Sequence, residues 1–351
     1  MPEQKHQQLD WISSLRVIAM LLVVVLHTTS PMLMAYGKEP NSYWLIADFY
    51  NALSRFGVPV FVMITGALLL PRDYELGDFL RKRLGRILPP FIFWSSVYIL
   101  YSWYNEDITF TDNVWANITL VLHQFKYGAY YHLWYVYMLI GLYFIIPILS
   151  RFVRNASEKE VVYFLLLWFM VMAITQPYLS RYNPQIDLHY ITGYIGYLVL
   201  GHYLAFKQLP GWMNARWFGI LFLVSLAIII AGTYFTSMAG KALSTMFYEP
   251  ISPTIVLLSG SAFMIGKSAT FKPSLKVKKA IGFADRYTFG IYLSHALLLT
   301  IFDDPDYGIN INYKLCTPVV SIPLTAVLVF CSAWLLVWLI SKIPFGKWVA
   351  M

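Results

Sequence analysis

The chain has 351 residues, of which 58% are hydrophobic and 13% charged, and its mean hydropathy is +0.58. Its 26 Lys and Arg and 18 Asp and Glu side chains cannot form the polar shell that a soluble protein of this size needs. The composition excludes a disordered chain, a coiled coil and a disulfide scaffold, and it predicts an all-α integral membrane protein. The net charge of +8 does not indicate nucleic-acid binding, because the basic residues are spread between apolar runs.

Ten apolar runs follow one another along the chain, most of them long enough to cross about 30 Å of hydrocarbon as a helix. The first run begins after a short polar leader without a small-residue cleavage site, so we expect a retained helix and no signal peptide. The predicted spans are residues 11–30, 55–71, 87–105, 133–152, 160–178, 190–206, 217–237, 250–267, 283–302 and 318–340.

The distribution of basic residues predicts the orientation of this bundle. With the N-terminus in the cytoplasm, eighteen Lys and Arg residues lie on the cytoplasmic side, five on the outer side and three at or within helices. Basic loops remain on the cytoplasmic side of a membrane, so both termini are predicted to be cytoplasmic. We expect residues 1–351 to form a single transmembrane domain without an appended soluble domain.

Two ionisable residues in the first span, Arg16 and His27, lie on one face of the predicted helix. Their separation of eleven residues corresponds to three turns plus about 20°, and it places them about 16 Å apart along the axis. Intramembrane ionisable groups are usually functional. The structural alternatives are that Arg16 reaches the cytoplasmic headgroups and that His27 only bonds to a neighbouring helix.

Three further arginines can each have either a functional or a structural role. Arg55 precedes Gly57 and Pro59 at the outer end of the second predicted span, where an arginine is also a common interfacial anchor. Arg83 and Arg86 share a helical face at the cytoplasmic start of the third span. They either enforce topology or bind phosphate groups, for which the guanidinium fork is well suited.

Four residues at the fourth and ninth predicted spans complete the candidate set. His132 and Trp134 open the fourth span, and Tyr292 and His295 lie in the ninth. His295 lies roughly 18 Å above the inner end of its helix, a depth similar to that of His27, which allows the two imidazoles to meet. Trp134 and Tyr292 also fit an ordinary aromatic belt. The sequence contains no motif for a metal site or a permanently bound cofactor.

With these residues in place, the chain resembles the membrane-bound acyltransferase family 3, whose members are O-acyltransferases of bacterial surface glycans. Within that family it is most similar to the enterobacterial common antigen O-acetyltransferase branch and to the intercellular-adhesin polysaccharide proteins. Thr65 stands where many members have serine, which keeps the hydroxyl. The matching segments are Leu9-Asp10-Trp11, Arg16 with His27, residues 55–66, the basic run through Arg86, residues 132–135 and residues 288–295.

The resemblance implies that acetyl-CoA, or another acyl-CoA, is a cytoplasmic co-substrate and that a glycan or lipid-linked glycan is the acceptor. It also implies a multi-pass protein of the bacterial inner membrane that contacts lipids and can form a homo-oligomer. No family acid maps onto this chain, so the partner that orients His27 stays open. The implied site has His27 and Arg16 as catalytic residues, Arg83 and Arg86 at the donor, and Arg55, His132, Trp134, Tyr292 and His295 at the acceptor or in support.

Two other functions compete with acyl transfer. A polysaccharide or lipid-linked sugar exporter also uses an aromatic-rich bundle with intramembrane arginines, and a membrane scaffold within a glycan synthase is a third alternative. A transporter predicts a wide path lined by polar residues from several helices. The strongest polar signal here is one two-residue column above a basic cytoplasmic end, which favours an enzyme.

Overall fold

The computed structural model describes residues 2–174, 176, 193–269 and 273–350, and every regular element within them is helical. The end of the predicted span at 160–178 and the start of that at 190–206 lie outside the described residues. The helices are α1 Pro2–Met34, α2 Asn41–Ser54, α3 Gly57–Leu69, α4 Leu76–Tyr104, α5 Val114–Tyr127, α6 Trp134–Asn155, α7 Glu158–Ile174, α9 Ile195–Phe206, α10 Ala215–Gly240, η2 Met246–Tyr248, α11 Pro253–Ser268, α12 Leu275–Arg286, α13 Thr288–Asp303, η3 Pro305–Tyr307, α14 Pro318–Ile340 and α15 Lys347–Ala350.

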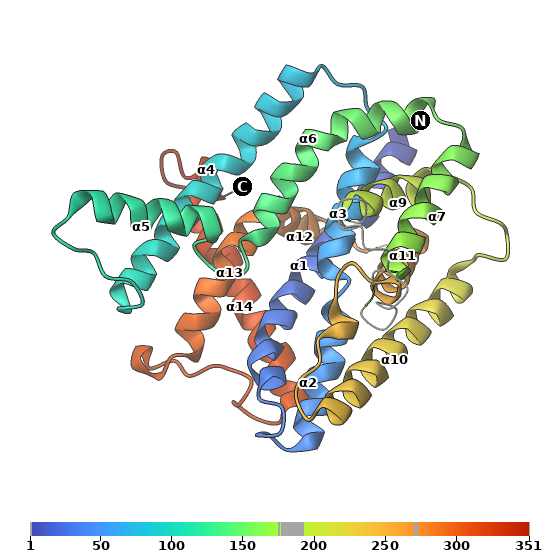
Figure 1. Ribbon diagram of the computed structural model, residues 1–351. Coiled ribbons are helices and arrows are strands. Elements are labelled where there is room, and N and C mark those ends of the chain that lie inside the picture. Colours follow the sequence, from blue (N-terminus) through green and yellow to red (C-terminus); the bar gives the residue numbers. More distant parts are fainter. Residues whose placement is uncertain (1, 175, 177–192, 270–272, 351) are drawn as a thin grey trace.

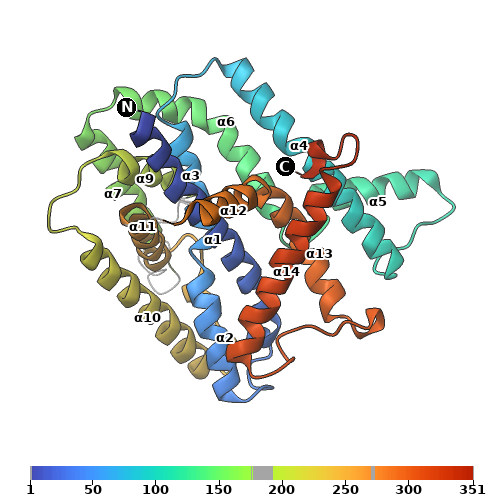
Figure 2. The same ribbon diagram turned by 180° about the vertical axis from the view of Figure 1, so that it is seen from behind.

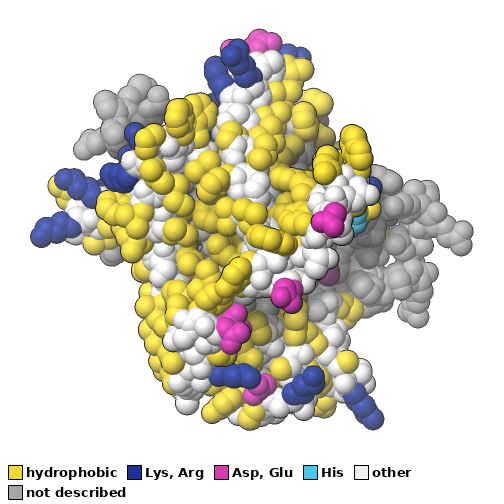
Figure 3. Space-filling view, turned by 90° about the vertical axis from the view of Figure 1, so that its left-hand side faces the viewer, with side chains coloured by type: hydrophobic (Ala, Val, Ile, Leu, Met, Phe, Trp, Pro, Cys, Tyr) yellow, Lys and Arg dark blue, Asp and Glu magenta, His cyan; other side chains and the backbone are white. Residues whose placement is uncertain are grey.

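Six helical segments are long and apolar enough to cross a membrane, and α9 and α13 are shorter apolar helices. The prediction of an all-helical membrane protein is therefore confirmed, while the count of ten spans and the cytoplasmic termini stay predictions. In Figure 3, hydrophobic side chains dominate one face of the molecule and most charged side chains lie toward its margins. The six segments are Trp11–Met34, Asn41–Leu69, Trp134–Asn155, Ala215–Gly240, Met246–Ser268 and Pro318–Ile340.

The predicted start of the second span, residue 55, is wrong, because the apolar helical segment begins earlier in the chain. The apolar segment starts at Asn41 and runs through α2 and α3 to Leu69. Polar residues in α2 hid this start from the hydropathy pattern, but Asp48, Asn51 and Ser54 are buried against the rest of the protein. Arg55 consequently lies in the middle of the segment and not at its outer end.

The first helix, α1, forms the axis of the fold. It packs against α2, α3, α11, α12, α13 and α14, and both ribbon views show it running through the middle of the bundle (Figures 1 and 2). Side chains along α1 therefore meet side chains from segments far apart in the sequence, which is how the candidate site is assembled.

At one end of α4, Glu75 caps the helix that carries Arg83 and Arg86. Its carboxylate accepts hydrogen bonds from the amides of Asp78, at 2.7 Å, and Gly77, at 3.2 Å. These two bonds hold the pKa of the Glu75 carboxyl below its usual value, because they stabilise the charged form. The cap fixes where the helix starts and so fixes the face on which the two arginines lie.

The closest helix packing joins α3 to α9 through two glycines. A Cβ atom added at Gly66 would lie 1.9 Å from the Leu198 carbonyl oxygen, and one at Gly201 would lie 2.1 Å from the Met63 carbonyl oxygen. Small residues that let two backbones approach are typical of helix packing in membranes. Neither position has room for a side chain.

We expect Gly201→Ala to destabilise the protein by roughly 1 to 3 kcal/mol, since overpacking forces the two backbones apart. The measurement is the Tm of the detergent-purified protein. Gly219→Ala in α10 is the matched control, because an added Cβ meets nothing within 4 Å there. Equal Tm values for the two variants would contradict the packing.

Candidate functional site

Three histidines from separate parts of the chain form a histidine cluster, consisting of His27 in α1, His132 just before α6 and His295 in α13. The ring centres of His27 and His295 lie 5.3 Å apart, and those of His132 and His295 lie 5.0 Å apart. The predicted meeting of His27 and His295 is thus found in the structure. The sequence did not predict that His132 would join them.

Aromatic side chains hold the two deeper histidines in place. The Tyr292 hydroxyl donates to the His132 carbonyl oxygen, and Nδ1 of His295 lies 2.6 Å from the Tyr292 carbonyl oxygen. Tyr98 donates to the Leu293 carbonyl oxygen at 2.8 Å. The Tyr292 bond fixes α13 against the segment before α6, and the Tyr98 bond fixes α13 against α4. Tyr292 therefore has a structural role that an aromatic belt would not predict.

His27 is the accessible member of the histidine cluster. Its side chain is half-buried, whereas His132 is 1% and His295 0% exposed. The ring of Tyr131, which is 55% exposed, lies 5.0 Å from that of His27 between centres. A molecule that reached the cluster would therefore meet Tyr131 and His27 first. No described carboxylate forms an ion pair with His27.

Arg16 binds a carboxylate that the sequence analysis did not single out. Its Nη1 lies 2.8 Å from Oδ1 and 3.0 Å from Oδ2 of Asp285, in the last turn of α12. Ser13 donates to the same carboxylate at 2.9 Å, and the Arg16 and Asp285 side chains are 25% and 15% exposed. A signal was present, because Asp285 is an ionisable residue inside the predicted span 283–302.

Arg55 belongs to a buried polar network beside His27. Its guanidinium lies 4.0 Å from the centre of the Tyr248 ring, and its Nη2 donates to Asn51 Oδ1 at 2.5 Å. The Tyr248 hydroxyl donates to Asp48, and Asn51 donates to Thr29 Oγ1 at 2.8 Å. Arg55 therefore lies inside the bundle and is not the interfacial anchor considered above. The hydrophobic periodicity of the sequence does not predict which residues contact Arg55.

The structure does not bring Arg83 and Arg86 to the histidine cluster. Arg86 is exposed and Arg83 half-buried, with the guanidinium of Arg83 5.8 Å from the Phe79 ring centre. Neither forms an ion pair with a described carboxylate.

The remaining candidate, Trp134, lies at the edge of the site. It is 44% exposed, and its ring centre is 6.0 Å from that of Tyr194. It makes no ring contact with the histidine cluster among the described residues. Exposure of this kind suits either an aromatic belt or a surface against which a ligand stacks.

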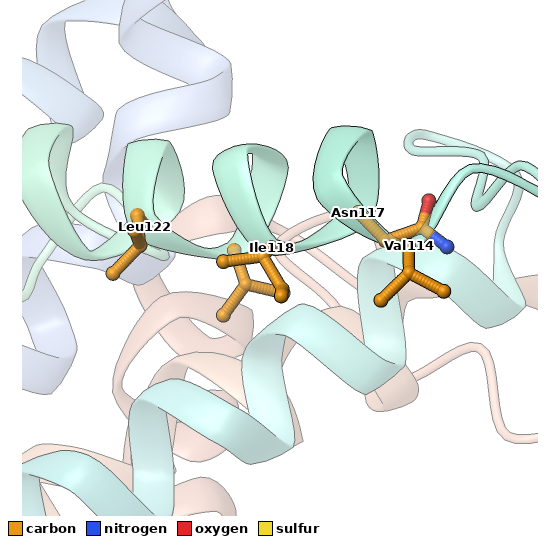
Figure 4. Close-up of a pocket in the computed structure, with 5 residues that line it drawn as sticks. Val114, Asn117, Ile118 and Leu122 are labelled. Carbon is orange, nitrogen blue, oxygen red and sulfur yellow. The ribbon is translucent and has the colours of Figure 1, made fainter.

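An open groove lies outside this site, along α5, which projects from the side of the bundle (Figures 1 and 2). It has a volume of about 320 Å³ and contains no ionisable side chain, so it offers nothing for acid–base chemistry. Figure 4 shows side chains of α5 pointing into it. The lining residues are Val114, Asn117, Ile118, Val121 and Leu122.

Together the fold and the site define a polytopic membrane protein with a half-buried imidazole above an arginine on one helix. The acyltransferase family 3 pattern, described as an acyltransferase domain, matches residues 9–341. YfiQ of Bacillus subtilis (strain 168), which is named as a membrane-bound acyltransferase, is 23% identical over 360 positions that cover 97% of this chain and 93% of that protein. No solved structure shows a significant match.

The chain therefore belongs to acyltransferase family 3, and it is a membrane-bound acyltransferase. This confirms the family that the motifs around Arg16, His27 and His295 indicate. The narrower similarity to the enterobacterial common antigen branch stays a prediction.

We expect Asp285→Ala to destabilise the protein by roughly 1.5 to 3 kcal/mol, the range for hydrogen bonds to charged groups, because it leaves Arg16 without a counter-ion. The Tm of the purified protein measures this effect. Asp78→Ala is the control, since Asp78 pairs with Lys82 at 3.6 Å while the two side chains are 68% and 72% exposed. Such surface pairs contribute about 0 to 1 kcal/mol, so a Tm loss as large as that of Asp285→Ala would contradict the expectation.

Proposed function

We propose that the protein transfers an acetyl group from cytoplasmic acetyl-CoA to a hydroxyl of a cell-surface or lipid-linked glycan. The observation that carries the proposal is the imidazole of His27, which is partly exposed and forms no ion pair with a described carboxylate. Membership of an acyltransferase family supports acyl transfer as the reaction. The acetyl donor and the glycan acceptor are proposed from the resemblance of the motifs.

In this proposal His27 acts as the general base. Its unprotonated nitrogen takes the proton of the acceptor hydroxyl as the oxygen attacks the thioester carbonyl, because a neutral imidazole ring carries a lone pair that accepts a proton. The tetrahedral intermediate collapses, the C–S bond breaks, and the proton on His27 passes to the leaving thiolate. An O-acyl ester and a free thiol result, and the histidine returns to its neutral form.

Arg16 and the cytoplasmic arginines bind the donor. Arg16 lies about 16 Å from His27 along α1, a separation that an extended thioester arm spans. Asp285 and Ser13 hold the Arg16 side chain, while Arg83 and Arg86 have no carboxylate partner among the described residues. Guanidinium groups without a carboxylate are suited to bind phosphates of the donor.

The acceptor would approach His27 from the side of Tyr131. We assign Arg55, His132, Tyr292 and His295 to the support of this region, and Trp134 to its edge. The proposal places the protein in the bacterial inner membrane with both termini in the cytoplasm, in contact with lipids, as a single domain that can form a homo-oligomer. Acetyl-CoA enters as a co-substrate and no permanently bound cofactor is required.

His27→Ala should abolish acetyl transfer while the protein inserts and folds normally. Removal of a general base costs roughly 10² to 10⁴ in rate, and this substitution leaves the lipid-facing surface unchanged. The measurement is the incorporation of radiolabelled acetyl groups into glycan by membranes supplied with labelled acetyl-CoA.

His123→Ala, which removes an exposed imidazole from α5, is the matched control. Normal incorporation by His27→Ala at wild-type expression would refute the role of His27. If the wild-type protein moved a labelled glycan across vesicles without acetylating it, the exporter hypothesis would replace the proposal.

Replacing Arg83 and Arg86 by Gln should raise the KM for acetyl-CoA by more than tenfold and lower kcat less. Contacts made equally in the ground and transition states affect KM, and each charged hydrogen bond contributes about 1.5 to 3 kcal/mol. The matched control replaces Arg81, which is exposed on another face of α4, and Lys159, which is exposed on α7, by Gln. Equal effects of the two double variants, or loss of membrane insertion in both, would assign these arginines to topology alone.

A further inference from the structure

His27, the proposed base, lacks the hydrogen-bond partner that usually orients a catalytic histidine. In a general-base histidine, one nitrogen takes the proton and the other is held by an acceptor that fixes the tautomer, most often a carboxylate. No described carboxylate contacts His27, and the ring contacts that the structure records for it are with Tyr131 and His295. Of these two rings, only that of His295 has a nitrogen acceptor.

The surroundings of His295 determine where its own proton lies. Nδ1 is 2.6 Å from the Tyr292 carbonyl oxygen, which can only accept a hydrogen bond. Nδ1 therefore carries the hydrogen, and in the neutral ring Nε2 carries a lone pair. The His295 ring is fully buried. Its partner residue, Tyr292, is itself held in place, because the Tyr292 hydroxyl donates a hydrogen bond to the segment before α6. The lone pair is thus held in a fixed place.

Nε2 of His295 is a hydrogen-bond acceptor without a donor among the described residues. It is buried, which is unfavourable for an unpaired polar atom inside a protein. The centres of the His27 and His295 rings are 5.3 Å apart. Two imidazoles joined by an N–H···N bond have their centres about 5 Å apart, so a small rotation of His27 completes the bond.

We propose that His295 is the positioning residue of the site and that its Nε2 accepts the N–H of His27. This bond leaves the lone pair on the other nitrogen of His27, which faces the acceptor hydroxyl. The inference rests on the proposed function of His27 as the base. His295 itself touches no substrate, and it takes the place that a carboxylate holds in other histidine-dependent enzymes.

Two substitutions of His295 separate positioning from packing. The amide oxygen of His295→Gln reaches the place of Nε2 and still accepts a hydrogen bond, whereas His295→Phe keeps a flat ring without an acceptor. We expect kcat to fall roughly 10- to 100-fold in His295→Phe, as for the loss of one hydrogen bond to a charged group. The KM values for donor and acceptor should stay within about twofold, and His295→Gln should recover most of kcat.

A third variant, His295→Asn, tests the same inference if His295→Phe does not fold. The short amide of His295→Asn can bond the Tyr292 carbonyl oxygen but places no acceptor at Nε2, so its kcat should fall as in His295→Phe. His202→Phe is the matched control, because it removes a buried imidazole from α9, outside the histidine cluster. Wild-type kcat in folded His295→Phe or His295→Asn would overturn the inference, and so would equal losses in His295→Gln and His295→Phe.

The remaining outcomes distinguish this inference from the proposed function. An active His27→Ala refutes the base itself, whatever His295 does. An inactive His27→Ala together with fully active His295 variants refutes only the positioning role. The ring of His132 lies 5.0 Å from that of His295, so a loss of kcat in His132→Phe as large as in His295→Phe would assign Nε2 to His132 and overturn the bond to His27.

Discussion

Polar side chains inside an apolar bundle must find their partners within the protein, and this constraint organises the structure. Lipid offers no hydrogen bonds, so each buried ionic group is costly unless another segment satisfies it. Arg16 is satisfied by Asp285, 269 positions along the chain. Arg55 donates a hydrogen bond to Asn51 and lies against the ring of Tyr248. These contacts fix how the helices are arranged around α1.

The same constraint separates two chemical environments along α1. At the level of Arg16, an ion pair and a serine hydroxyl make a charged site that remains partly exposed. At the level of His27, the ring neighbours are Tyr131 and the buried His295, which in turn contacts the buried His132. An ion-paired arginine and a cluster of histidine and aromatic rings therefore coexist on one helix, because three turns of helix lie between them.

In the proposed site, the base His27 is oriented by a second imidazole and not by an acid. A carboxylate beside His27 would have to be desolvated in the bundle, which is unfavourable for an ionised group. The proposed bond uses a second imidazole, held by a backbone carbonyl, as an acceptor without a net charge. The hydrogen bond from Nδ1 of His295 to Tyr292 uses only a residue one turn earlier in the same helix, so the arrangement needs few additional contacts.

The sequence by itself determined the helical membrane class, the common face of Arg16 and His27, and the similar depth of His295. Those features depend on composition and on helical spacing, which are local properties of the chain. Only the tertiary structure decided that Asp285 binds Arg16, that His132 joins the histidine cluster, and that Arg55 lies mid-bundle in a network with Asp48 and Tyr248. The physical reason is that these contacts join helices distant in sequence, and helix-to-helix packing leaves no periodic signal in one segment.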